Sequence, residues 1–81
     1  MTKDEIKTRA RAALARALKV APETITDNAS QEDLSAWDSV RHMNVVLALE
    51  NDFDIEFDDE ELPKMTSLNA LVAAIERHVA G

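Results

Sequence analysis

Residues 38–53 read DSVRHMNVVLALENDF and carry the clearest helical pattern in this 81-residue chain. Apolar side chains recur there at three- and four-residue steps, the spacing that places them along one face of an α-helix. They are Val40, Met43, Val46, Leu47, Leu49 and Phe53. Asp38 stands directly before them, and aspartate is a preferred N-cap because its carboxylate accepts a hydrogen bond from the first turn. The stretch therefore predicts a helix that begins after Asp38.

Two more helical patterns flank this stretch. The first follows Thr2, which has capping-box spacing to Glu5, and it runs toward the helix breaker Pro22. The last follows an N-cap at Thr66 or Ser67. We expect the core to combine apolar residues of all three helices, namely Met43, Val46 and Phe53 with Ile6, Leu14, Leu18, Leu71, Val72 and Ile75.

The remaining segments connect these helices. Residues 20–37 show no sustained period and predict a long loop, tethered to the core by Ile25, Ala29 and Leu34. Residues 52–58 alternate charged with apolar residues, but because no partner strand follows, we expect an extended connector. Asp58 and Glu61 have the spacing to cap one turn that ends before Pro63, which predicts a short helix. The expected fold is all-α: a small bundle of three principal helices and one short helix.

Composition and charge exclude several classes of function. Sixteen acidic residues against nine basic ones give a net charge of -7, which disfavours binding to nucleic acid or to anionic membranes. The chain has no cysteine, which excludes disulfides and thiolate metal sites. Residues 1–19 hold six basic and two acidic residues, whereas residues 50–61 hold eight acidic residues and no basic one. No apolar run approaches the length of a membrane span, so we expect a cytosolic protein. We also expect a monomer, and the acidic net charge favours basic partners.

The acidic stretch suggests a calcium loop, but its pattern is incomplete. Asp52, Asp54 and Glu56 stand at the first, third and fifth positions of an EF-hand loop. Phe57 occupies the position that requires glycine, and Pro63 occupies that of the bidentate glutamate. We therefore expect no metal site.

Ser39 is the residue with the most chemical interest. On the first helical turn its side chain should face solvent, beside unpaired backbone N–H groups that favour an anion; the alternative is an ordinary serine at a helix start. Asp38, Ser39 and His42 also offer a carboxylate, a nucleophile and a base. A domain of this size, however, has no element left to build an oxyanion hole, so we expect no catalysis. His42 and His78 are expected to be solvated surface residues.

Several stretches, taken together, are similar to the acyl carrier proteins, which are phosphopantetheine-binding carriers. That family is marked by an Asp-Ser-Leu-type tripeptide at the start of the second helix, and residues 37–40 here read WDSV. The same helix ends with LALENDF at residues 47–53, and MTSL at residues 65–68 opens the last helix. The resemblance covers most of the chain and implies a single carrier domain over residues 1–81, with the four-helix bundle of the family.

The resemblance implies a role for each matching residue. A phosphopantetheinyl transferase, using coenzyme A and magnesium, attaches 4′-phosphopantetheine to Ser39, while Asp38 caps the helix and presents the serine. The thiol of that arm then carries an acyl or aminoacyl group as a thioester, so the chain is a carrier and not an enzyme. The caps at Thr2 and the end at Gly81 favour a free-standing protein. The alternative is an acidic helical interaction module with the same fold that is never modified.

The resemblance also implies a partner surface. Val40 and Leu47 either form an apolar stripe that partners recognise or belong to the core; Glu50, Asp52 and Glu56 add acidic charge for ligases, synthases or transferases with basic docking patches. Arg41, His42 and Asn44 stand where the family usually has acidic or small neutral residues. We therefore expect a specialised fatty-acid, polyketide or related biosynthetic pathway.

Overall fold

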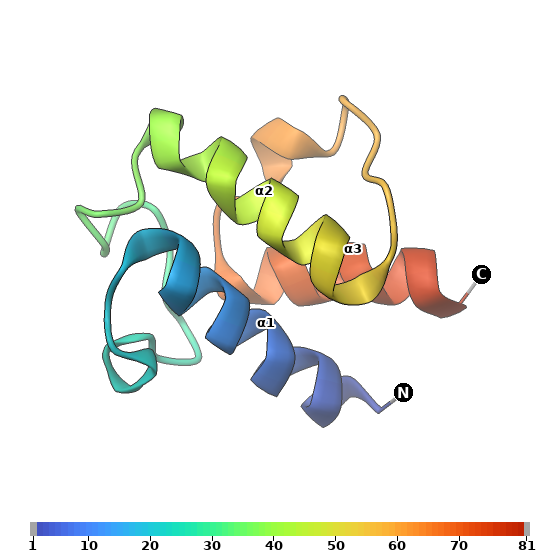
Figure 1. The fold of residues 1–81 in the computed structure, drawn as a ribbon, viewed down its shortest axis with the longest axis horizontal. Coiled ribbons are helices and arrows are strands. Elements are labelled where there is room, and N and C mark those ends of the chain that lie inside the picture. Colours follow the sequence, from blue (N-terminus) through green and yellow to red (C-terminus); the bar gives the residue numbers. More distant parts are fainter. Residues whose placement is uncertain (1, 81) are drawn as a thin grey trace.

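The computed structural model describes residues 2–80 and contains three α-helices joined by long connections (Figure 1). They are α1 (Lys3–Leu18), α2 (Ser39–Phe53) and α3 (Leu68–Ala80). Two short 3₁₀ turns, η1 (Pro22–Thr24) and η2 (Leu62–Lys64), lie in the connections. The described residues form no strand beyond one isolated bridge, so the prediction of an all-α bundle is confirmed. Within residues 2–80, no helix has the length and apolar character to cross a membrane.

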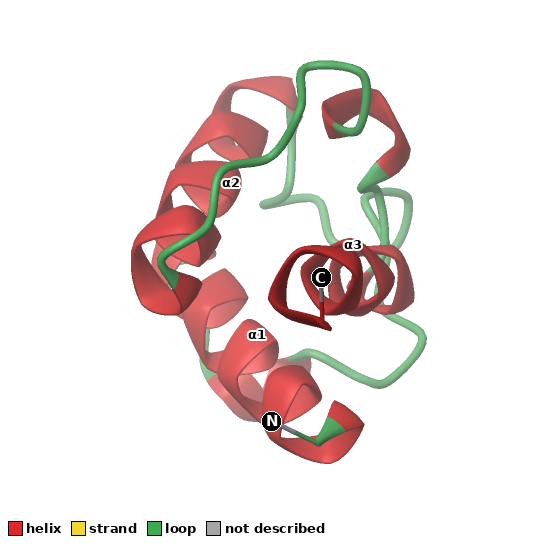
Figure 2. Ribbon diagram, turned by 90° about the vertical axis from the view of Figure 1, so that its right-hand side faces the viewer, coloured by secondary structure: helices red, strands yellow, loops and turns green. Residues whose placement is uncertain are grey.

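The helices enclose one apolar interior. α1 and α2 run antiparallel side by side, and α1 also contacts α3 (Figure 1). A view along α3 shows the three helices arranged around a shared centre (Figure 2). The predicted core residues are buried except for one. The large buried side chains of the three helices include Ile6, Leu14, Leu18, Val45, Val46, Leu49, Phe53, Leu68, Leu71, Val72 and Ile75.

Met43 is the exception, and the prediction that it belongs to the core is wrong, because 47% of the residue is exposed. α2 carries two apolar stripes with the same spacing. Val46, Leu49 and Phe53 form the buried stripe, whereas Met43 belongs with Val40 and Leu47 on the exposed one. Since a three- and four-residue step fits either stripe, spacing alone does not say which one faces the core.

The helix ends follow the predicted caps. The side chains of Thr2, Asp38 and Ser67 each accept a hydrogen bond from the backbone N–H three residues on, at 3.1, 2.8 and 3.1 Å. Ser67, rather than Thr66, therefore caps α3. α1 and α2 are each followed by a C-cap residue in the left-handed conformation, Lys19 with φ 59° and Asp54 with φ 53°.

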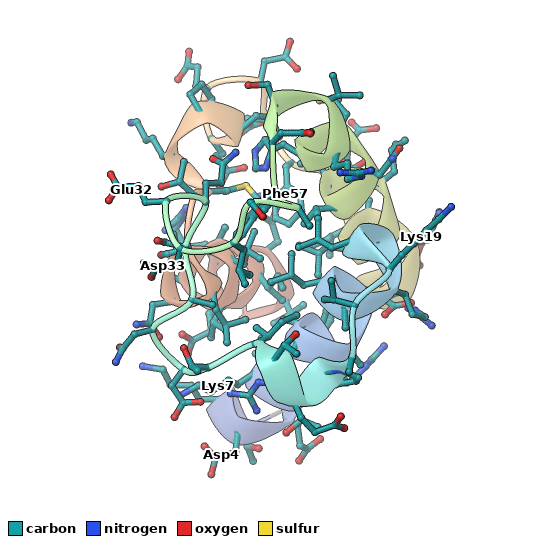
Figure 3. The ribbon with its side chains drawn as sticks, turned by 90° about the vertical axis from the view of Figure 1, so that its left-hand side faces the viewer. Asp4, Lys7, Lys19, Glu32, Asp33 and Phe57 are labelled. Carbon is teal, nitrogen blue, oxygen red and sulfur yellow. The ribbon has the colours of Figure 1, made fainter. Side chains whose placement is uncertain are left out.

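The long loop over residues 20–37 is tethered as expected, but its largest anchor was not predicted. Ile25 and Ala29 are buried, and Leu34 is partly buried against the core. Trp37, at the end of the loop, is only 1% exposed and is among the largest fully buried side chains. Glu32 and Asp33 project outward from the same loop (Figure 3).

Ion pairs and backbone bonds fix the loop to the helices. Asp27 pairs with Lys7 at 3.3 Å and with Arg11, and these contacts, first of all the hydrogen bond from Lys7, lower the pKa of Asp27. Figure 3 shows Lys7 at the side of α1 that the loop covers. Near α3, the backbone of residues 29–31 bonds to that of residues 66–68 at 2.9 Å. The loop is therefore fixed to α1 by ion pairs and to the start of α3 by backbone hydrogen bonds.

The short helix differs from its predicted bounds. The segment 58–61 forms a turn, closed by the Asp58 N–H to the Glu61 carboxylate and by the Glu61 N–H to the Asp58 carbonyl, both at 2.9 Å. The helical turn itself is η2 and contains Pro63, so the prediction that the short helix ends before this proline is wrong. Proline fits because the first helical turn needs no N–H from it.

Candidate functional site at the start of α2

Ser39 is the first residue of α2 and is exposed, as the sequence predicts. The Asp38 carboxylate accepts from the Arg41 N–H at 2.8 Å, which sets the direction of the first turn. The Arg41 guanidinium lies 3.7 Å from the same carboxylate and donates to the Ala36 carbonyl at 3.4 Å. The serine hydroxyl thus stands at a well-defined helix end whose dipole favours negative charge.

The residue before the cap is held from three directions. The Trp37 N–H donates to the Leu34 carbonyl at 2.9 Å, and the Trp37 carbonyl accepts from the Gln31 amide at 3.4 Å. Its indole N–H donates to His42 Nδ1 at 3.0 Å. Because Trp37 is buried, the chain enters α2 from a fixed point.

The expectation that His42 and His78 are solvated surface residues is wrong. His42 is partly buried between Trp37 and Leu62, whose carbonyl lies 2.9 Å from Nε2, and its ring stacks on the indole. His78 is partly buried as well, with Nε2 2.8 Å from the Glu61 carboxylate. His42 stands three and seven residues before the buried Val45 and Leu49, and this position on the core side of α2 is the signal that could have shown its burial.

The hydrolase arrangement is not assembled. Both ring nitrogens of His42 are engaged, by Trp37 and by Leu62, and the Asp38 carboxylate faces the backbone of α2 and Arg41. Within residues 2–80, no group of three or more histidine, aspartate or glutamate side chains is placed to hold a metal ion. The start of α2 therefore presents an accessible hydroxyl without a histidine placed to activate it.

An exposed apolar stripe runs along α2 from this serine. Val40 is 79% and Leu47 is 53% exposed, so the structure places both on the surface and not in the core. Arg41 and Asn44 are exposed on the same helix, and Glu56 is exposed in the connector that follows it. These residues surround Ser39 and α2 with a mixed apolar and polar surface.

Two acidic residues of the predicted surface have contacts inside the fold. Glu50 is partly buried and accepts from the Phe57 N–H at 2.9 Å, which holds the connector against α2. Asp52 pairs with Arg16 at 2.9 Å, and its carbonyl accepts from Arg9. Both carboxylates thus contribute to the packing of α2, beside any role toward partners.

Glu61 lies at the centre of a second polar cluster, where the turn before η2 meets α3. Its carboxylate accepts from the Asp58 N–H and from Arg77 at 3.1 Å, and it lies 2.8 Å from His78 Nε2. The hydrogen bond with His78 is the largest cause that lowers the pKa of Glu61 to about 2. Phe57 packs edge-on against His78, with ring centroids 5.2 Å apart.

The start of α2 suits a phosphodiester-linked group. An exposed hydroxyl on the first turn offers the oxygen, and backbone N–H groups of that turn favour the phosphate charge. Asp38, which directs the turn through the Arg41 N–H, leaves Ser39 at the surface. The residues present therefore fit 4′-phosphopantetheine.

Comparison with known proteins identifies the family of the chain. The family model described as a phosphopantetheine attachment site matches residues 8–75. Among solved structures, the holo acyl carrier protein from Geobacter metallireducens, determined by solution NMR, is similar at 26% sequence identity and a TM-score of 0.77. The match covers 98% of this chain and 86% of that one. These findings confirm the resemblance seen in the sequence: the chain belongs to the phosphopantetheine-binding acyl carrier family, whose members are non-catalytic carriers with a covalently attached 4′-phosphopantetheine.

Proposed function

We propose that this chain carries acyl or aminoacyl intermediates on a 4′-phosphopantetheine arm attached to Ser39. The observation that carries the proposal is the exposed Ser39 at the start of α2, directly after a cap that orients the first turn. During attachment, Ser39 Oγ forms the phosphodiester, loses its proton to the transferase and displaces 3′,5′-ADP from coenzyme A. The attached arm supplies a thiol, which forms thioesters; this chain has no cysteine of its own.

The partner surface in this proposal is the exposed side of α2 with the connector. Val40 beside Ser39 and Leu47 further along α2 offer apolar contacts, while Glu50 and Glu56 add acidic charge. Phosphopantetheinyl transferases and the enzymes that load or use the thioester are the proposed partners. Charged residues at such a surface act mainly on encounter rate and partner choice.

Arg41 supports a specialised pathway. It is exposed close to Ser39, where a partner with a basic docking patch meets an unfavourable like charge. Arg41→Glu is expected to raise the rate at which fatty-acid synthase enzymes with basic patches load the holo protein. An unchanged rate, or wild-type loading as fast as that of their own carrier, would contradict the specialised role.

Intact mass spectrometry tests the attachment. The protein is incubated with coenzyme A, magnesium and a broad-specificity phosphopantetheinyl transferase, with Ser39→Ala in parallel. We expect a gain of one phosphopantetheinyl group in the wild type and none in the variant, whose stability should be nearly unchanged because Asp38 still caps α2. No gain with several transferases would favour the unmodified interaction module, which would use the same exposed stripe. The location in the cytosol and the monomeric state stay predictions.

A further inference from the structure

The ring of His42 joins three parts of the chain near Ser39. Nδ1 lies 3.0 Å from the indole nitrogen of Trp37, and Nε2 lies 2.9 Å from the carbonyl of Leu62. Trp37 closes the long loop, His42 itself is in the first turns of α2, and Leu62 opens η2. The segments before and after α2 therefore meet on one side chain.

These partners define one form of the imidazole. An indole N–H only donates, so His42 Nδ1 has to accept and carries no proton. A backbone carbonyl only accepts, so Nε2 has to donate and carries the proton. Among the forms of histidine, only the neutral Nε2–H tautomer makes both hydrogen bonds. A charged ring would place a second N–H against that of Trp37.

We propose that His42 is a positioning residue for the modification of Ser39: by accepting from Trp37 it fixes the chain that leads into the Asp38–Ser39 turn. This inference rests on the proposed function. Trp37 precedes the cap residue directly and its indole is buried, so the bond to His42 holds the side chain of the residue from which the chain enters the cap. The bond to Leu62 orients the same ring from the other side. His42 does not touch Ser39 Oγ in this role, and it acts through Trp37.

Three substitutions separate the two hydrogen bonds. In His42→Asn the amide oxygen can take the place of Nδ1 and accept from Trp37, whereas in His42→Gln the amide nitrogen can take the place of Nε2 and donate to Leu62. His42→Phe keeps an aromatic ring and removes both bonds. His78→Phe is the matched control, because it also removes a partly buried histidine bond, but one that links Glu61 to α3. Each variant is first confirmed as folded by circular dichroism at the assay temperature.

The steady-state rate of Ser39 modification is then measured for each variant with one transferase and coenzyme A. We expect His42→Phe and His42→Gln to lower kcat by about tenfold or more, the size of effect that misplacement of a reacting group produces, with little change in the KM for the carrier. We expect His42→Asn and His78→Phe to stay within about twofold of the wild type. Equal rates for all variants, a slow His42→Asn, or an equally slow His78→Phe would each overturn the positioning role.

Nitrogen-15 NMR of the unmodified protein gives a second readout. The chain has a single tryptophan, so one indole N–H signal reports on the Trp37 bond. We expect the Nε2–H tautomer for His42 in the wild type, and an indole signal that is displaced in His42→Phe and His42→Gln but retained in His42→Asn. An Nδ1–H tautomer would overturn the inference. A wild type that no transferase modifies, with the expected NMR signals intact, would instead refute the proposed function and remove the role of His42 with it.

Discussion

Replacement of Glu61 by glutamine tests how the segment before η2 is held on α3. The Glu61 side chain is 16% exposed, and its carboxylate meets the Asp58 N–H, Arg77 and His78. The substitution keeps the shape of the side chain and removes its charge. Glu61→Gln is therefore expected to weaken the contacts to Arg77 and His78 while leaving the core unchanged.

The pKa of Glu61 gives the upper limit of the effect. Its pKa falls from 4.5 to about 2, first because of the hydrogen bond with His78 and then because of the bond from the Asp58 backbone. Each unit of pKa corresponds to about 1.4 kcal/mol, so the limit is roughly 3 kcal/mol. Because Arg77 is largely exposed and solvent screens its charge, we expect a loss of about 1–2 kcal/mol at pH 7.

The sign of the pH dependence follows from a lowered pKa. The folded state holds the Glu61 carboxylate in its charged form more strongly than the unfolded chain does, so the stabilisation is fully present above pH 4.5 and disappears as the pH falls toward 2. The two proteins have the same sequence at every other position. The difference between wild type and Glu61→Gln therefore isolates this one group.

Urea denaturation followed by circular dichroism, at several pH values from 7 to 2.5, measures the difference. Glu60→Gln serves as the control, because it makes the same change of net charge at the exposed neighbouring residue. We expect the control to lie within about 0.5 kcal/mol of the wild type. The reasoning is refuted if Glu61→Gln matches Glu60→Gln at pH 7, or if its deficit persists undiminished at pH 2.5.

Four further substitutions test the fold around the site. Leu49→Ala, at a fully buried position, should lower the free energy of unfolding by about 2–5 kcal/mol, whereas Leu47→Ala on the exposed stripe should change it by less than about 0.5 kcal/mol. Urea denaturation measures both values, and equal losses would contradict the description of two stripes on α2. Asp38→Ala should cost about 1 kcal/mol in the same assay because α2 loses its cap, and an unchanged stability would mean that the cap is dispensable. Asp27→Asn removes the carboxylate that Lys7 and Arg11 share, so amide hydrogen exchange should rise in residues 20–37 more than in α3; a uniform rise would argue against a local tether.

Features that depend on near neighbours in the sequence were predictable. The caps at Thr2 and Asp38 use a backbone N–H only three residues away, so residue type and spacing are sufficient to identify them. The same holds for Ser39, whose exposure follows from its place on the first turn of a capped helix. The caps and the exposure of Ser39 were therefore predictable from local sequence, whereas its proposed role comes from the family resemblance.

Features that depend on distant partners were not predictable in this way. Trp37 is a single aromatic residue in a polar loop and belongs to no periodic pattern, yet it is a large part of the core. The ring of His42 takes one partner from residue 37 and the other from residue 62, and the second exists only because η2 packs against α2. Met43 was wrongly predicted to be buried for a related reason. The two apolar stripes of α2 have the same spacing, and packing against the rest of the fold decides which of them is buried.

The uneven charge along the sequence corresponds to ion pairs on α1 and an exposed acidic connector after α2. Three basic residues of α1 form ion pairs within the fold: Lys7 and Arg11 with Asp27 in the loop, and Arg16 with Asp52 at the end of α2. These pairs neutralise acidic groups beside α1 and hold the loop and the end of α2 in place. The acidic residues of the connector, such as Glu56 and Asp59, remain exposed. Because these pairs use positive charge of α1 within the fold, the exposed acidic residues of the connector beside α2 keep their negative charge for the basic partners that we propose.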